Sequence, residues 1–421
     1  MKVAHIASEM APIAKVGGLG DVVYGLAKQQ LKTDAPHVIL PNYSCIDSTL
    51  TNYEGIPLTL LGDYDQIYGG NEIERFALFC QQAFDFIQSQ DFDIIHLHDW
   101  PTALLAPMLK TPTVLSIHNV HHQGSCPPTL LQHLDLPLDK MQCPNHPDNV
   151  NILKGGLIYS DAIVTVSPGY AKEILTPEEG DGLDSVLNKY KSKLYGILNG
   201  IDIDYWNPAT DSFLAAPYDS PAGKAANKNH LLQSLNMLPG PLVCVITRLV
   251  PQKGLDMIEQ ALITTLEANC NFILLGSSPC PETQVRFENL AKTHASPHLH
   301  CHFTFNEKLA HQVYAAADII VIPSLFEPCG LTQMIAMRYH TVPLVRKTGG
   351  LANTVFDNQN GFTFTEPTPQ ACKATLKRAL DTLQSEPSKW GQLIENGAQS
   401  DFSWDKSAAA YRKIYSQLTH Q

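Results

Sequence analysis

The sequence predicts an α/β protein with two doubly wound, Rossmann-like domains. Short apolar runs alternate with amphipathic helical patterns, and this alternation occurs as two separate series along the chain. The length agrees, because 421 residues exceed the roughly 150 that are typical of one domain. Hydrophobic residues make up 44% and charged residues 17%, which indicates a globular chain rather than a disordered one.

The first series lies within residues 1–197. Its apolar runs are short and bounded by turn residues, as expected of buried parallel strands, and the patterns between them have helical spacing. The predicted strands are 3–7, 37–40, 94–97, 113–117 and 162–166, and the predicted helices are 19–31, 73–87 and 101–109.

The second series lies within residues 241–402. Its predicted strands are 242–247, 272–276, 319–322 and 342–345, and its predicted helices lie near 256–267, 307–316 and 330–339. Residues 198–240 are expected to connect the domains, since most of this stretch is rich in Pro, Asn, Asp, Ala and Gly. Residues 403–421 are expected to form a helix that is capped by Ser403 and returns to the first domain.

Composition also limits the partners. The chain has 29 Lys and Arg against 41 Asp and Glu, a net charge of −12, which argues against general binding to nucleic acid or anionic membranes. Its 10 cysteines contain no Cys-x-x-Cys pair, as expected for reduced thiols in a cytosol. The N-terminus turns polar at Ser8, too early for a signal peptide, and no apolar stretch approaches the roughly 20 residues of a membrane helix. We therefore expect a cytoplasmic protein with neither a nucleic-acid nor a membrane partner.

A glycine-rich segment follows the first predicted strand. Residues 15–21 read Lys-Val-Gly-Gly-Leu-Gly-Asp and open a predicted helix, where backbone amides can approach a phosphate and Lys15 adds positive charge. The segment matches neither the dinucleotide-binding fingerprint of dehydrogenases nor the phosphate loop of nucleoside triphosphatases. A tight turn without a ligand is the alternative.

Histidines gather at the ends of two predicted strands. His96, His98 and Asp99 end one strand, and His118, followed by the pair at 121–122, ends the next. A zinc site is one hypothesis. The spacing argues against it, because a His-x-His-x-Asp-His motif would need its aspartate one position later. We expect polar groups that face a ligand cleft, with His96 as a core histidine satisfied by hydrogen bonds.

Three further motifs follow strands of the second series. Arg248 and Lys253 lie five residues apart on one loop and can clamp a diphosphate, although a solvated basic turn is the alternative. Glu327 lies in Phe-Glu-Pro-Cys-Gly-Leu-Thr-Gln near a predicted helix start, where a carboxylate can hold sugar hydroxyls or cap the helix. A glycine-rich turn at 346–351 completes the set. Each signal is modest alone, but together they indicate a ligand site at the strand ends.

In chain order, these motifs resemble those of the bacterial glycogen synthases and plant starch synthases. The resemblance spans the whole chain and is carried by residues 15–21, 98–100, 118–119, 198–202, 248 with 252–256, 326–333, 348–351 and 402–404. It implies a GT-B fold with the active site in the cleft between two facing domains. It also implies transfer of glucose from ADP-glucose to the non-reducing end of an α-1,4-glucan with retention at C1, and neither metal nor other cofactor.

The resemblance assigns roles to particular residues. The implied catalytic residues are Glu327, His118, Arg248, Lys253 and Lys15. The implied substrate-binding residues are Gly17, Gly18, Asp21, Asp99, Trp100, Asn119, Asn199, Gln252, Cys329, Gly330, Leu331 and Thr332. The two cations of the second domain neutralise the departing diphosphate, Glu327 contacts the transferred glucose, and His118 lies near that glucose. Trp100 belongs to the acceptor and glucose sites. We expect front-face attack in which the departing phosphate takes the acceptor's proton, since no carboxylate is well placed as a nucleophile.

The chain departs from the family pattern at several positions. Pro101 replaces a common His, Asn353 replaces an Asp, and the histidines at 121–122 replace an Ala-Tyr type pair. The chain is also shorter than typical members, mainly between Pro41 and Arg75. Two other functions stay open: a related transferase that uses UDP-glucose or builds another glycan, and a non-catalytic glucan-binding remnant. The complete set of diphosphate-binding cations argues against the remnant.

Overall fold

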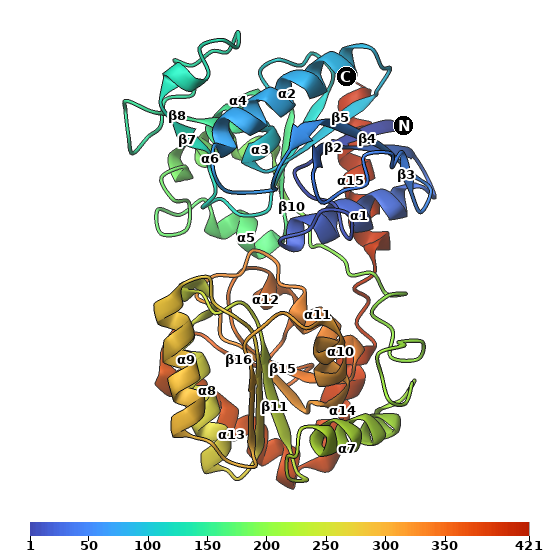
Figure 1. The fold of residues 1–421 in the computed structure, drawn as a ribbon, viewed down its shortest axis with the longest axis vertical. Helices are drawn as coiled ribbons and strands as arrows, with labels where there is room; N and C mark the ends of the chain where they lie inside the picture. Colours follow the sequence, from blue (N-terminus) through green and yellow to red (C-terminus); the bar gives the residue numbers. More distant parts are fainter. Residues whose placement is uncertain (421) are drawn as a thin grey trace. The chain divides into compact units, whose positions relative to one another are not determined.

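The computed structural model describes residues 1–420, which form two compact units (Figure 1). Unit 1 consists of residues 1–200 and 403–420, and unit 2 of residues 201–402. Each unit has a mainly parallel sheet with helices between successive strands, which confirms the predicted α/β class and Rossmann-like domains. No helix within the described residues is both long and apolar enough to cross a bilayer.

Unit 1 is built on an eight-stranded sheet within the described part of the chain. The strands are, in spatial order, β10 (Leu194–Gly196), β9 (Ala162–Thr165), β6 (Thr113–Ile117), β5 (Ile94–His98), β1 (Lys2–Ile6), β2 (Ala35–Tyr43), β4 (Ile56–Tyr64) and β3 (Asn52–Tyr53). All neighbours are parallel except the short edge pair β3 and β4. A separate antiparallel pair joins β7 (Ser125–Cys126) to β8 (Val150–Asn151). The central strands β1, β5 and β6 are almost wholly buried on both faces, in agreement with their mainly apolar sequences.

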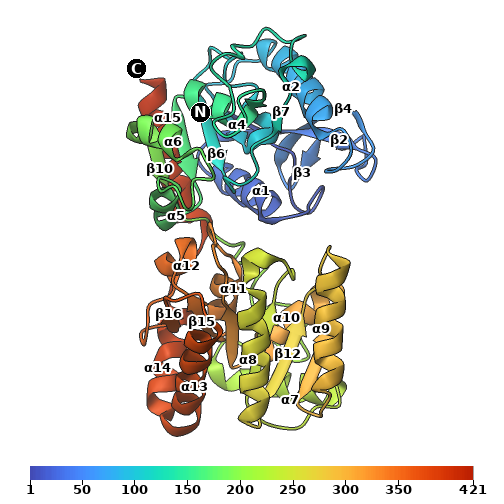
Figure 2. The same cartoon turned by 90° about the vertical axis from the view of Figure 1, so that its left-hand side faces the viewer.

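Helices cover both faces of this sheet. They are α1 (Gly18–Gln30), α2 (Glu72–Gln88), α3 (Trp100–Ala103), α4 (Ile152–Tyr159), α5 (Pro168–Glu173), α6 (Asp184–Lys189) and α15 (Trp404–Thr419). Helix α1 packs against α15, and α3 packs against both α2 and α4. Figures 1 and 2 show α15, in red, among the blue and green elements of unit 1. Its Trp404, Tyr411 and Tyr415 are buried in one core with Val3 and Leu26.

Three expectations for unit 1 need correction. The helix expected at 101–109 ends at Ala103, because Pro107 has no N–H to continue it and the chain goes on in turns. The stretch from 41 to 75, for which no strand was predicted, contains β4. Ser403 stands at the start of α15, but its hydroxyl donates to the Asp405 carboxylate and accepts no hydrogen bond from a helix amide.

Unit 2 is built on a six-stranded, fully parallel sheet within the described residues. The strands are, in spatial order, β13 (Leu299–His302), β12 (Asn271–Leu275), β11 (Leu242–Ile246), β14 (Ile319–Ile322), β15 (Val342–Arg346) and β16 (Phe362–Phe364). The helices are α7 (Lys224–Ser234), α8 (Leu255–Glu267), α9 (Pro281–Thr293), α10 (Glu307–Ala316), α11 (Thr332–Arg338), α12 (Gly349–Thr354), α13 (Pro369–Ser385) and α14 (Pro387–Ala398). Figure 1 shows α8, α9 and α13 on one side of the strands and α7, α10 and α11 on the other.

Most of the segment expected as an interdomain connection is packed within unit 2. Residues 201–240 belong to this unit and include α7. The Lys224 ammonium is buried and donates hydrogen bonds to the carbonyls of Tyr314 and Tyr339 and to the Thr341 hydroxyl. Asp211 is buried as well and accepts a hydrogen bond of 2.7 Å from the Tyr339 hydroxyl. The composition predicted a connection between the domains, but these polar groups have buried partners within unit 2.

Candidate active site

The glycine-rich loop of unit 1 is organised by Glu9, which the sequence analysis did not single out. Its carboxylate oxygen Oε2 accepts hydrogen bonds from the amides of Val16, at 2.6 Å, and Gly17, at 2.9 Å. The Tyr68 hydroxyl donates to the other oxygen at 2.7 Å. The Gly17 amide was expected to meet a phosphate of the ligand, but in the structure it donates its hydrogen bond to the Glu9 side chain. The sequence signal was an acidic residue three positions after the end of β1.

Space for a ligand remains beside this loop. A Cβ atom built on Gly17 or Gly18 would meet no atom within 4 Å, so the surface over both glycines is open. The exposed Lys15 ammonium forms an ion pair of 2.8 Å with Asp21, one turn into α1. Lys15, Gly17, Gly18 and Asp21 thus lie on one accessible loop and helix start.

Asp99 holds the chain that carries His118. Asp99 follows β5 with a φ of 58°, and its carboxylate accepts a hydrogen bond of 2.6 Å from the His118 amide. Burial raises the pKa of the Asp99 carboxyl to about 7, although the amides of His118 and Asn119 oppose the shift. Asn119 lies beside them and accepts a hydrogen bond from the His121 amide. Asn199, expected to reach the cleft, is only 4% exposed, and its buried Oδ1 has no hydrogen-bond partner among the described residues.

Three histidines of unit 1 form a compact buried group. His5, His96 and His98 can bring ring nitrogens within 4.8 Å of one another. Both ring nitrogens of each already have side-chain hydrogen-bond partners; for His96 these are Ser116 and Tyr415, each at 2.7 Å. The donor set is therefore occupied by hydrogen bonds, which fits a metal site poorly. His96 is a buried histidine with both nitrogens satisfied, as predicted.

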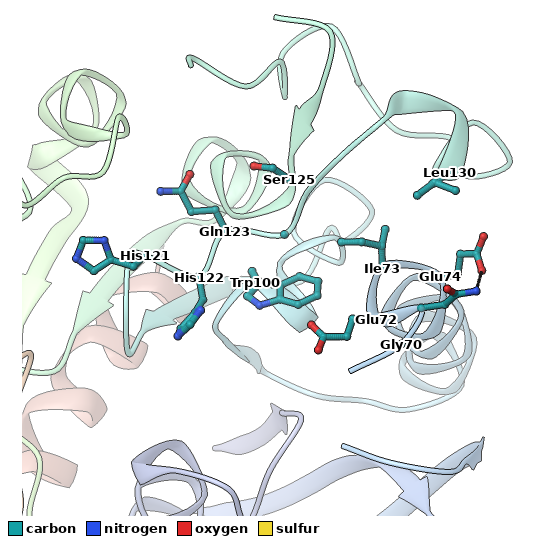
Figure 3. A pocket seen from close by; sticks show the side chains of 12 residues that line it. Gly70, Glu72, Ile73, Glu74, Trp100, His121, His122, Gln123, Ser125 and Leu130 are labelled. Carbon is teal, nitrogen blue, oxygen red and sulfur yellow. Dashed lines mark hydrogen bonds between the residues drawn. The ribbon is translucent and has the colours of Figure 1, made fainter. Parts of the chain in front are cut away.

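A cavity of about 540 Å³ lies beside Trp100 in unit 1 (Figure 3). It is lined by Gly70, Asn71, Glu72, Ile73, Glu74, Trp100, His121, His122, Gln123, Gly124, Ser125 and Leu130. Figure 3 shows the Trp100 ring between the loop at His122 and the start of α2 at Glu72. Trp100 is held by an edge-on contact with Phe76, at 5.3 Å between ring centroids. An aromatic ring bordered by carboxylates and amides suits a polyhydroxylated ligand.

In unit 2, two of the predicted motifs meet. The Lys253 ammonium and the Glu327 carboxylate form an ion pair of 2.6 Å, and the Ser324 hydroxyl donates to the same oxygen at 2.8 Å. Gln252 donates to the Phe326 carbonyl at 3.2 Å and so ties the two loops together. Ser324 was missed, because only the pairing of Lys253 with Glu327 reveals its role. Arg248 is exposed on the loop that leads to this cluster.

The turn after Glu327 is braced by the second glycine-rich turn. The Gly350 amide donates to the Glu327 carbonyl at 3.0 Å, and Gly350 lies so close to Cys329 that a Cβ would overlap the Cys329 backbone. Gly330 has a φ of 73°, which favours glycine. Leu331 caps α11, which begins at Thr332 rather than near residue 330, so Glu327 precedes the helix by a full turn. The helix thus begins two residues after the expected start near residue 330, and Glu327 stands five residues before its first residue.

Each unit thus gathers its own predicted residues. Unit 1 holds Lys15, Gly17, Gly18, Asp21, Asp99, Trp100, His118, Asn119 and Asn199, and unit 2 holds Arg248, Gln252, Lys253, Glu327, Cys329, Gly330, Leu331 and Thr332. The expected cleft between two facing domains stays a prediction.

The chain was compared with known proteins. Residues 2–189 match the starch synthase catalytic domain family, and residues 232–399 match the glycosyl transferases group 1 family. The chain is 39% identical to the glycogen synthase of Protochlamydia amoebophila over 497 aligned residues, covering 100% of this chain and 99% of the relative. It is also 39% identical to the glycogen synthase of Geotalea daltonii, covering 99% of this chain and 98% of the relative.

A solved structure gives the same result. The catalytic domain of starch synthase IV from Arabidopsis thaliana, bound to ADP and acarbose, matches with a TM-score of 0.93 and 39% identity, covering 100% of this chain and 99% of that one. Fold and motifs together define a glycosyltransferase of the GT-B class that transfers hexosyl groups. More particularly, the chain belongs to the family of the glycogen synthases and starch synthases. The resemblance drawn from the sequence is confirmed.

Proposed function

We propose that this enzyme transfers glucose from ADP-glucose to the non-reducing end of an α-1,4-glucan, with retention of configuration at C1. We further propose that it needs neither a metal nor another cofactor, and that it acts in the cytoplasm. The observation that carries the proposal is the cluster of Lys253, Glu327 and Ser324, which joins a cation and a carboxylate from two family motifs at 2.6 Å.

On the donor side, the cations supply the charge that a metal supplies in other transferases. Arg248 and Lys15 are exposed, while Lys253 is held next to Glu327. In the proposed complex, Arg248 and Lys253 neutralise the diphosphate as it leaves, and Glu327 contacts the glucose. ADP as the nucleotide is supported by the related starch synthase IV structure, which was solved with ADP.

On the acceptor side, the cavity beside Trp100 supports a glucan. The largely buried Trp100 ring forms part of the cavity wall, and Glu72, Glu74 and Gln123 offer hydrogen-bonding groups around it. The same starch synthase IV structure holds acarbose. The histidines at 121–122, which replace the family's usual pair, line this cavity.

The proposed chemistry is a front-face displacement. The bond from C1 to the phosphate oxygen breaks, the acceptor hydroxyl oxygen bonds to C1 from the same face, and its proton passes to the departing phosphate. Three carboxylates near the motifs are engaged by hydrogen bonds: Asp99 by the His118 amide, Glu327 by Lys253 and Ser324, and Glu9 by two loop amides. This supports a route without a covalent glycosyl–enzyme intermediate. His118 next to the glucose would face the positive charge that develops on the sugar.

One assay tests the proposal. The purified protein is mixed with ADP-glucose and glycogen, release of ADP is followed, and the new linkage and anomeric configuration are read by NMR. We expect ADP release that requires glycogen, gives α-1,4 linkages and continues after exhaustive treatment with EDTA. UDP-glucose as the clearly preferred donor would replace ADP-glucose in the proposal. Binding of glucan without any transfer would instead indicate a binding remnant. Loss of activity to EDTA with recovery on adding Zn²⁺ or Mg²⁺ would overturn the metal-free mechanism.

A further inference from the structure

Four side chains of unit 1 form one continuous line of hydrogen bonds, here called the histidine chain: Gln30, His5, His98 and His118. Gln30 Oε1 lies 2.7 Å from His5 Nε2, His5 Nδ1 lies 3.1 Å from His98 Nε2, and His98 Nδ1 lies 3.1 Å from His118 Nε2. Only His118 belongs to the implied catalytic residues. The other three are fully or almost fully buried, with exposed fractions of 0–1%.

The fold places these residues in line. Strands β1 and β5 are adjacent and parallel, with His5 level with His96, so His98 extends just beyond His5 at the carboxyl end of the sheet. His118 follows β6, the next strand on the other side of β5, where His98 is level with Ser116. Gln30 is the last residue of α1 and closes the line at its buried end.

The direction of the hydrogen bonds follows from proton counting. Burial lowers the pKa of His5 to about 4, of His118 to about 3 and of His98 well below its usual value, so all three rings are neutral at pH 7. A neutral imidazole has one donor nitrogen and one acceptor nitrogen. Gln30 Oε1 only accepts, so the protons lie on Nε2 of His5, then of His98, and then of His118. Nδ1 of His118 is left without a proton.

At the Gln30 end of the histidine chain, the side-chain amide has a second hydrogen-bond partner. Gln30 Nε2 donates to the Tyr415 hydroxyl at 3.4 Å, and that hydroxyl lies 2.7 Å from His96 Nδ1. Since His96 Nε2 lies 2.7 Å from the Ser116 hydroxyl oxygen, this orientation of the Gln30 amide is satisfied when Tyr415 donates to His96 and His96 donates to Ser116. The structure has the oxygen of the Gln30 amide, and not its nitrogen, facing His5, and a reversed amide would reverse the direction of every hydrogen bond in the histidine chain.

We propose that Gln30, His5 and His98 are positioning residues that hold the His118 ring neutral and in one tautomer, with Nδ1 as a hydrogen-bond acceptor for a hydroxyl group of the bound sugar. This inference rests on the proposed function, because it needs His118 to contact the sugar. A neutral acceptor ring at that point avoids repulsion of the positive charge that develops on the sugar. It also selects a substrate that offers a hydroxyl donor there.

The test uses four variants. His98→Leu breaks the chain, whereas His98→Gln keeps one donor and one acceptor at nearly the same spacing as an imidazole. Gln30→Met removes the acceptor that sets the direction. His37→Leu is the matched control, because His37 is a histidine of the same sheet that bonds only Thr59 among the described residues, outside the chain. We expect His98→Leu and Gln30→Met to lower kcat roughly ten- to a hundredfold, with donor and acceptor KM within about threefold. His98→Gln is expected to recover most of the activity, and His37→Leu to retain it.

A spectroscopic measurement decides the tautomer independently of activity. In ¹⁵N spectra of histidine-labelled protein, protonated and unprotonated ring nitrogens are distinct, and the His118 signals are assigned by their loss in His118→Gln. We expect an unprotonated Nδ1 in the wild-type protein and a mixture of tautomers in Gln30→Met. A proton on Nδ1 of His118 in the wild type, or equal loss of kcat in His98→Gln and His98→Leu with both folded by circular dichroism, would overturn the inference. If the wild type uses no sugar nucleotide, the proposed function fails while the tautomer result still stands on its own.

Discussion

Lys253 and Glu327 form a largely buried ion pair. The two side chains are only 18% and 10% exposed, and Ser324 adds a hydrogen bond to the same carboxylate oxygen. Each partner therefore relieves the cost of burying the other. In the proposed reaction, the leaving diphosphate competes with Glu327 for Lys253, which frees the carboxylate at the moment when charge develops on the sugar.

A double-mutant cycle measures this coupling. Lys253→Ala leaves a buried carboxylate without its cation, and we expect it to lower the free energy of unfolding by about 3 kcal/mol. Glu327→Gln removes the charge while keeping a polar side chain of the same size, so the double variant should lose less than the sum of the single losses, by roughly 1–3 kcal/mol. Urea unfolding of the full chain provides the values. Additive losses would contradict a coupled pair and leave only two independent contacts.

The buried histidines predict how stability depends on pH. The folded pKa of His5 lies at about 4, and those of His96 and His98 lie well below the usual 6.5, in each case mainly through burial. Below pH 6.5 the unfolded chain therefore binds more protons than the folded one, so these groups lower stability as the pH falls. Between pH 7 and 5.5, we expect a loss of about 1 kcal/mol for each histidine. His118 and His340, whose pKa values are lowered to about 3 and about 4, add to this effect, whereas Asp99, whose pKa is raised to about 7, works in the opposite direction as a single group.

The check is urea unfolding at a series of pH values between 5.5 and 7.5. The His98→Gln variant has one buried histidine fewer and should show a shallower decline toward acid. An identical decline in both proteins would assign the acid effect to other groups.

At the scale of elements, burial on both faces decided what the sequence could predict. Strands β5 and β14 are buried at every position and were placed within a residue or two; β14 is a continuous apolar run, and β5 is apolar except for His96 and His98. Strand β4, which lies between β2 and the edge strand β3, was missed because it has exposed positions and no clear alternation. The edge strand β13 was missed because it is only half-buried. Helix α10 was predicted with its observed ends, whereas the expected helix at 101–109 failed at a proline.

The site residues, too, could be predicted only where a local sequence pattern marks them. The loops at residues 15–21 and 326–333 were visible because glycines and charges mark strand ends. Glu9, His5 and Ser324, which support the site residues, were not visible because none of them lies in a motif of its own. Each acts through a side-chain hydrogen bond, with Gly17, His98 and Glu327 respectively, that only the structure reveals. Local patterns predict where a site lies, but pairwise geometry decides which neighbours support it.

Two glycines of unit 2 give opposite predictions for the same substitution. A methyl group on Gly350 would overlap the backbone of Cys329, so Gly350→Ala should lower the free energy of unfolding by about 1–3 kcal/mol and displace the turn that follows Glu327. A methyl group on Gly391, inside α14, meets nothing within 4 Å, so Gly391→Ala should stabilise by about 0.5–1 kcal/mol. Thermal unfolding and activity of both variants test this. A change of the same sign in both would contradict the packing assigned to Gly350.

At the scale of the whole molecule, the chain is shorter than its relatives. The alignment with the Protochlamydia amoebophila enzyme runs to 497 residues, although this chain has 421. The relative therefore has segments that this chain lacks. The loss was predicted between Pro41 and Arg75, a stretch that does not contain Asp99, His118 or Lys253, although its residues 70–74 line the cavity beside Trp100.

This shortening predicts a change in acceptor preference. Remote contacts with a polymer add affinity through multivalency and leave the chemical step unchanged. We expect ordinary kcat on maltotetraose, but a smaller ratio of kcat/KM for glycogen over maltotetraose than in the Protochlamydia amoebophila enzyme, assayed in parallel. Equal ratios in the two enzymes would mean that the missing residues formed only a surface loop.

The final helix has a consequence for how the chain is made. Helix α15 completes the core of unit 1, and its Tyr415 hydroxyl bonds the ring of His96. A ribosome synthesises all of unit 2 before it reaches α15. The first strands of unit 1 therefore lack this packing partner until synthesis is nearly complete. During that interval, the apolar side chains of Val3, Val22 and Leu26 lack the cover that Trp404 and Tyr411 give them in the finished protein. A nascent chain halted at residue 402 would therefore carry a complete second unit behind an unfinished first one, a state that general chaperones would be expected to bind.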